Sequence, residues 1–119
     1  MMENKEILKQ LESIVFHDIP VEYLELKVME EVHFRVCFAL YQEDKKEYDY
    51  WELSFLEIET FESDYLSLDR EVDMEITSFN YEFDTCYNCE IEFLLGSSKP
   101  SLIIEMNCKT ITLKPIKLF

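Results

Sequence analysis

The sequence of 119 residues contains a single glycine, Gly96, and three prolines. Loops that bind phosphates need several glycines, because the backbone must approach the ligand closely. The sequence therefore excludes a phosphate-binding loop and a dinucleotide-binding motif. Long apolar runs are also missing, and stretches such as Phe93-Leu94-Leu95 are far too short to span a membrane. We accordingly expect no cofactor and no membrane insertion.

Basic residues are scarce. Lys and Arg number 11 against 26 Asp and Glu, which gives a formal net charge of −15, and nearly all of the excess lies within residues 43–92. Such a charge repels nucleic acids and anionic membranes and attracts basic proteins. The composition therefore predicts a basic protein partner and argues against a nucleic-acid-binding function.

The four cysteines are Cys37, Cys86, Cys89 and Cys108. The first residues, Met1 to Lys5, do not resemble a secretory signal, so we expect reduced thiols in the cytoplasm rather than a disulfide framework. Cys86 and Cys89 form a CxxC pair, which could in principle serve zinc binding or thioredoxin-like redox chemistry. A second CxxC pair and a following helix are both absent from the pattern. We therefore interpret these cysteines as unconnected thiols and predict no metal.

The N-terminal segment has the apolar spacing of a helix. The apolar residues recur at positions three and four apart, with Asn4 as the N-cap and Pro20 barring continuation. This pattern predicts an amphipathic helix over residues 1–16. Its apolar face comprises Ile7, Leu8, Leu11, Ile14 and Val15.

After Pro20 the apolar period changes to two, which is typical of β-strands. The alternation is clearest in Val32, Phe34, Val36, Phe38 and Leu40. It slips near Leu56 and again near Ser78, where we expect β-bulges or turns. The sequence predicts a single domain over 1–119, α+β and mostly β, with residues 20–119 forming an antiparallel sheet or sandwich of six to eight strands.

Acidic residues recur at strand spacing. Like charges beside one another on a sheet repel, so each row is either a solvated surface or a docking site for a basic partner; a site for a hard cation is a third interpretation. We take the rows as candidate partner-binding residues. They are Asp69, Glu71, Asp73 and Glu75 in one row, and Glu57 and Glu59 in a shorter one.

No catalytic constellation is visible. His17 and His33 are the only histidines, and although His17 precedes Asp18, neither histidine has a sequence context that marks a nucleophile. The expectation is that the protein is not an enzyme.

Three segments give the chain a resemblance to the small acidic immunity-type proteins of bacterial toxin systems. These are Phe16-His17-Asp18 at the start of the β region, Trp51-Glu52-Leu53-Ser54-Phe55, and the predicted hairpin from Glu90 to Met106 with Gly96 to Pro100 at its tip. The resemblance implies a non-enzymatic inhibitor that occludes a cognate toxin, and it assigns a role to no particular residue.

Two functions are therefore compared below. The first is an acidic binding protein, of the immunity or inhibitor kind, that docks a basic protein. The alternative is an accessory β domain that binds a small molecule in a concave, aromatic-lined pocket.

Overall fold

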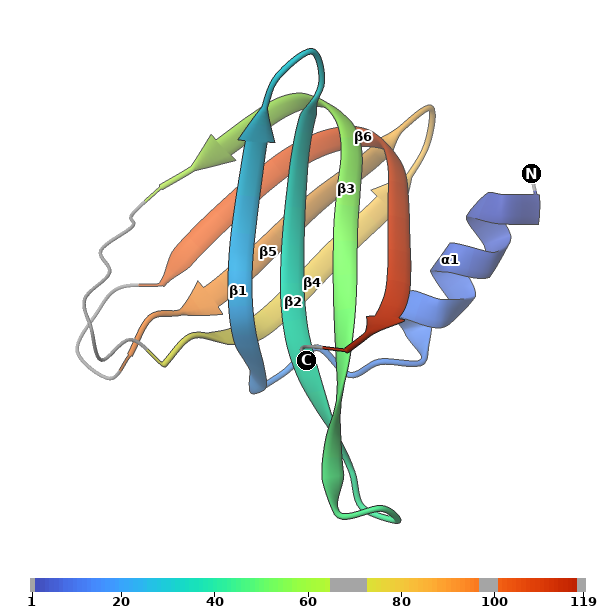
Figure 1. Cartoon of the computed structure of the whole chain (residues 1–119). Coiled ribbons are helices and arrows are strands. Elements are labelled where there is room, and N and C mark those ends of the chain that lie inside the picture. The colour runs from blue at the N-terminus through green and yellow to red at the C-terminus, as the bar shows by residue number, and fades with distance from the viewer. Residues whose placement is uncertain (1, 65–72, 97–100, 118–119) are drawn as a thin grey trace.

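The structure, a computed structural model, describes residues 2–64, 73–96 and 101–117 (Figure 1). Within these ranges the chain forms one helix and six antiparallel strands, which confirms the predicted α+β class and a strand count at the lower end of the expected range. In chain order the elements are α1 (Met2–Glu12), β1 (Ile19–Val28), β2 (Val32–Gln42), β3 (Glu47–Ser63), β4 (Glu75–Phe83), β5 (Tyr87–Leu94) and β6 (Leu102–Ile116).

The strands form one closed sheet in the order β1-β2-β3-β6-β5-β4. The two longest strands, β3 and β6, pair with each other from Tyr50 opposite Ile116 to Ser63 opposite Ile104. Both are strongly bent in Figure 1. As a result β1, β2 and the start of β3 form one side of the barrel, while β4, β5 and the start of β6 form the other.

The barrel closes at a short seam between β1 and β4. Among the described residues, two pairs form this seam, Ile19 with Ile76 and Pro20 with Glu75. The N–H of Val21 adds a hydrogen bond of 2.9 Å to a carbonyl just before β4. Past Ile76, β5 is the one strand that pairs with β4 in the described part of the chain.

Both expected bulges are present. In β3 the register with β6 shifts between Ile58 and Thr60, and Glu57 has φ of 54°, in the left-handed region that non-glycine residues rarely adopt. In β4 the register with β5 shifts between Ile76 and Ser78. Each irregularity changes which alternate residues face inwards, which explains why the apolar pattern of the sequence slips at the same places.

Apolar side chains from all six strands fill the interior of the barrel. Phe55 lies at its centre, with the ring of Phe34 stacked at 6.0 Å and the ring of Phe79 edge-on at 5.8 Å. A six-stranded barrel is narrow enough for side chains alone to fill it. The other buried residues include Phe38, Leu53, Ile76, Tyr87, Ile91, Phe93, Leu102, Ile104, Met106 and Ile111.

The helix is shorter than predicted, because α1 ends at Glu12 rather than at residue 16. The hydroxyl of Ser13 donates a hydrogen bond of 2.6 Å to the carbonyl of Gln10, and this local bond competes with continuation of the helix. Val15 is 81% exposed, so the prediction that it belongs to the buried apolar face of the helix is wrong.

The segment after α1 closes one end of the barrel. Phe16 packs edge-on against Phe38, with ring centroids 5.8 Å apart, and against Phe79 at 5.2 Å. Ile7 and Leu11 of α1 are buried in the same core. The helix thus adds apolar contacts beside β6 and leaves the outer surfaces of β4 and β5 uncovered (Figure 1).

Candidate functional site

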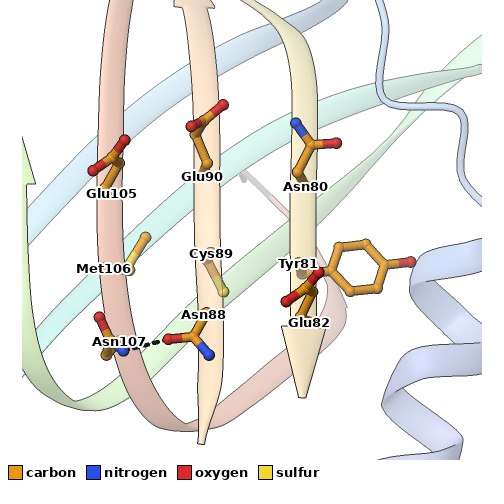
Figure 2. Close-up of a pocket in the computed structure, with 9 residues that line it drawn as sticks. All are labelled: Asn80, Tyr81, Glu82, Asn88, Cys89, Glu90, Glu105, Met106 and Asn107. Atoms are coloured by element: carbon orange, nitrogen blue, oxygen red, sulfur yellow. Dashed lines mark hydrogen bonds between the residues drawn. The ribbon is translucent and has the colours of Figure 1, made fainter. Parts of the chain in front are cut away.

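Four exposed glutamates, one from each of four neighbouring strands, lie on the outer surface of the barrel. Glu62 of β3, Glu105 of β6 and Glu90 of β5 are directly opposite one another, and Glu82 of β4 lies one row further along. Three of them are visible in Figure 2 on adjacent strands. Because neighbouring strands are about 4.8 Å apart, the carboxylates are held close together. We call Glu62, Glu82, Glu90 and Glu105 the acidic face.

The charges of the acidic face are not compensated by ion pairs among the described residues. Like charges directly opposite each other on adjacent strands destabilise a sheet. On the other side of the barrel, Glu25 and Glu52 have basic neighbours. These ion pairs are Arg35–Glu25 at 3.4 Å, Lys114–Glu52 at 3.7 Å and Lys27–Glu25 at 3.8 Å.

A row of neutral polar side chains borders the acidic face. The Thr60 hydroxyl donates a hydrogen bond of 2.6 Å to the Asn107 side-chain oxygen, and the Asn107 amide donates to the side-chain oxygen of Asn88. Asn88 and Asn107, together with Glu82, Glu90 and Glu105 of the acidic face, line a shallow hollow of about 300 Å³ (Figure 2). Asn80 and Tyr81 lie on its β4 side. The hollow is open to solvent, and its lining combines carboxylates and amides with the side chains of Cys89 and Met106.

Of the longer row of acids predicted from the sequence, Asp73 and Glu75 lie within the described residues. Asp69 and Glu71 lie outside the described residues. Asp73 is exposed but precedes β4, and Glu75 is half-buried at the seam, opposite Pro20. The expectation that Asp73 and Glu75 project side by side from one strand is therefore wrong, because β4 begins only at Glu75.

The shorter predicted row is also interrupted. Glu57 and Glu59 are both exposed, but Glu57 has a left-handed φ and the register shift with β6 falls at Glu59, between Ile58 and Thr60. The carboxylate of Glu59 lies 4.0 Å from the ammonium group of Lys109, although the sequence pattern offered no nearby base. Pairing with β6 supplies this cation from a position fifty residues away in the chain.

None of the four residues of the acidic face was among the predicted partner-binding residues, although Glu90 alternates with buried residues in β5. Glu62 and Glu105 become neighbours only because β3 pairs with β6. In the sequence, each of them looks like any exposed polar residue of a strand. The cluster can be recognised only once the register of strand pairing is known.

Three of the cysteines approach one another, and Cys37 lies apart on β2. A thiol–thiol hydrogen bond with Cys108, together with burial, raises the pKa of Cys89. Cys86 accepts a weak hydrogen bond of 3.9 Å from the Asn107 amide. No set of three His, Cys, Asp or Glu side chains in the described ranges is arranged to hold a metal ion together.

Each histidine lies beside an acid at the surface. His17 is 3.3 Å from Asp18, and His33 is 3.1 Å from Glu31. The Nδ1 atom of His17 is also 3.3 Å from the carbonyl oxygen of Thr77. These contacts account for both rings without placing either one beside a serine or cysteine nucleophile among the described residues.

A second polar cluster surrounds Glu52, a carboxylate that is only 8% exposed. The Tyr23 hydroxyl donates a hydrogen bond of 2.8 Å to Glu52, and Lys114 lies 3.7 Å from its other oxygen. Burial, followed by the hydrogen bond to Glu52, raises the pKa of Tyr23 to about 12. Burial likewise raises the pKa of the Cys37 thiol beneath it to about 11. The cluster is satisfied internally, which is the mark of a structural role.

Replacing Tyr23 with Phe should destabilise the protein by about 1–2 kcal/mol, because Glu52 stays buried with one partner fewer. The raised pKa also gives a pH signature. Between pH about 10 and about 12 the unfolded chain releases the Tyr23 proton while the folded chain retains it, so stability falls as the pH rises. Urea denaturation at pH 7 and pH 11 should show a smaller alkaline loss for Tyr23→Phe than for the wild type. An equal loss in both proteins would contradict this assignment.

No protein-family model, curated protein or solved structure matches the chain. Within the described residues, no helix combines the length and the apolar character that a membrane crossing requires. The function must therefore be argued from the geometry of the acidic face.

Proposed function

We propose that this protein is a non-enzymatic binding protein whose acidic face docks a basic protein partner. The observation that supports the proposal most is the row Glu62–Glu105–Glu90, three directly opposed carboxylates with no cation among the described residues. Lys or Arg side chains of a partner would remove this repulsion on binding, and the net charge of −15 would accelerate encounter. Proteins tolerate destabilising arrangements, such as this row of like charges, mainly at functional sites.

Inhibition of a basic toxin, in the manner of immunity proteins, is the particular form of this function that we propose. An acidic face spread over four strands offers a broad, rigid surface for occlusion, and occlusion needs no catalytic group. The free cysteines of the described structure fit a reducing compartment, so we place this activity in the cytoplasm.

The small-molecule alternative has less support. A ligand site in a barrel of this kind requires an unfilled interior, whereas Phe55, Phe38 and Phe93 are completely buried in the packed core. The hollows lined by the described residues open at the outer surface. The deep aromatic pocket that would favour a small molecule is not formed by this part of the chain.

The proposal is tested by affinity capture from an extract of the native cell at about 50 mM and about 500 mM salt, salt being the variable that screens exposed charges. Three immobilised proteins are compared: the wild type, Glu105→Lys in the centre of the row, and Glu30→Lys in the β1–β2 turn. Glu30 is exposed, and the two variants change the net charge equally. We expect a basic protein that the wild type and Glu30→Lys retain at low salt and that Glu105→Lys loses. Equal retention by all three would refute the acidic face as the docking site.

A further inference from the structure

The edge of β4 that faces away from β5 is the place where an extended strand can be added next to the acidic face. From Ser78 to Phe83, β5 is the one strand paired with β4 among the described residues. Alternate residues of such an edge present unpaired N–H and C=O groups, a template for another strand. Asn80 and Glu82 are exposed, and Phe83 is 40% exposed, so this stretch is accessible from the outer surface.

The helix does not occupy this edge. No Cα atom of α1 lies within 8 Å of a Cα atom of β4, whereas neighbouring strands approach to about 5 Å. The side chain of Tyr81 is half-buried and points towards α1 (Figure 2). At the start of the edge, the Nδ1 atom of His17 lies 3.3 Å from the carbonyl oxygen of Thr77. The unpaired part of the β4 edge therefore begins at Ser78, after the bulge in β4.

Acidic groups flank the edge on both sides. Glu82 lies on β4, Asp84 follows the strand, and both are exposed. On the helix side, Glu12 at the end of α1 is close enough that its charge, after burial, contributes to a raised pKa of Tyr81. Lys9, one turn earlier in α1, is the nearest base of the helix in sequence and is also exposed. An added strand at this position would therefore meet predominantly negative charge.

We infer that a basic, extended segment of the protein partner adds to the sheet along residues 78–83 of β4. This inference rests on the proposed function and specifies how the partner is held. Main-chain hydrogen bonds to β4 provide the register, and alternate Lys or Arg side chains on the outer surface reach Glu82 and Glu90. A second copy of this chain is a poor occupant, because pairing two β4 edges would bring the Glu82 and Asp84 carboxylates of both copies together.

The test uses an acetylated and amidated peptide of alternating lysine and threonine, about ten residues long, which is enough to cover one strand. Its counterpart carries an N-methyl group on every residue, so it keeps the charge but has no backbone N–H to donate to a strand edge. Affinities are measured by calorimetry at low salt, and amide exchange of residues 78–83 is followed by NMR. We expect the unmodified peptide to bind at least tenfold more tightly than the N-methylated one and to protect the amides of β4.

The other outcomes separate the two proposals. Equal binding of both peptides, without protection of β4, would overturn strand addition and leave docking on the acidic face standing. No binding of either peptide at low salt would overturn both. Protection of the β4 amides without peptide, together with a dimer in sedimentation, would show that a second copy occupies the edge and would overturn the inference. The matched variants Glu82→Lys and Glu43→Lys report on charge, and only Glu82→Lys should weaken binding by about tenfold.

Discussion

Replacing Phe55 with Ala should lower the free energy of unfolding by about 3–5 kcal/mol. Phe55 is fully buried, pairs with Phe34 on β2 and Ile111 on β6, and contacts the ring of Phe79. Its side chain therefore touches both sides of the barrel. The closed sheet restrains collapse around the missing ring, so a cavity would remain. Domains of this size have total stabilities of about 5–15 kcal/mol, and the loss is a large fraction of that range.

The control for this prediction is Tyr48→Ala, which also removes an aromatic ring. Tyr48 is 48% exposed and contacts Tyr41 at 5.2 Å, so we expect a loss of about 1 kcal/mol or less. Urea denaturation followed by tryptophan fluorescence measures both variants. Similar losses for Phe55→Ala and Tyr48→Ala would mean that the interior is not packed as described.

The second large effect concerns Glu105, which lies between Glu62 and Glu90. Glu105→Lys places a cation between two carboxylates, so stability should rise by about 0.5–1 kcal/mol. Binding should change in the opposite sense: association with the basic partner should slow by about tenfold or more at low salt, because the steering charge is reduced where contact occurs. Stopped-flow or surface-plasmon kinetics at two salt concentrations, combined with urea denaturation, measure both quantities.

The matched control is again Glu30→Lys, with the same change in net charge in the turn between β1 and β2, outside the acidic face. If it slows association as much as Glu105→Lys does, the effect comes from net charge and the acidic face is not the contact. If Glu105→Lys is less stable than the wild type, the carboxylates of the row do not repel one another in the folded protein. Gain of stability with loss of binding is the result expected only of a docking site.

The fold class was predictable from periodicity, since alternation of apolar residues depends on local geometry alone. Slips of the period near Leu56 and Ser78 even located the bulges of β3 and β4. The end of α1 was not predictable from spacing, because Ile14 and Val15 continue the helical pattern while the Ser13 side chain competes for a backbone carbonyl. Closure of the sheet through Ile19 and Ile76 also has no local signature.

The candidate site was less predictable than the fold. Rows of acids along one strand can be read from the sequence, and the residues selected on that basis were Glu57, Glu59, Asp69, Glu71, Asp73 and Glu75. A row across strands depends on the register of pairing between distant segments, which a single sequence does not specify. Whether the selected acids or the acidic face contact a partner stays a prediction for the experiments above.

The short seam also bears on how the chain reaches its folded state. Pairing within the hairpins β1–β2, β2–β3, β4–β5 and β5–β6 is local in sequence, so these contacts form early, whereas β1 and β4 must meet across more than fifty residues for two residue pairs. Seam closure is therefore expected to be the last step, after β3 has found β6. Until it occurs, β1 and β4 both expose unpaired edges, and the abundance of acidic residues near them keeps partly folded chains from joining edge to edge. Glu82 of β4, which we assign to partner binding, is thus also expected to oppose aggregation of a partly folded chain.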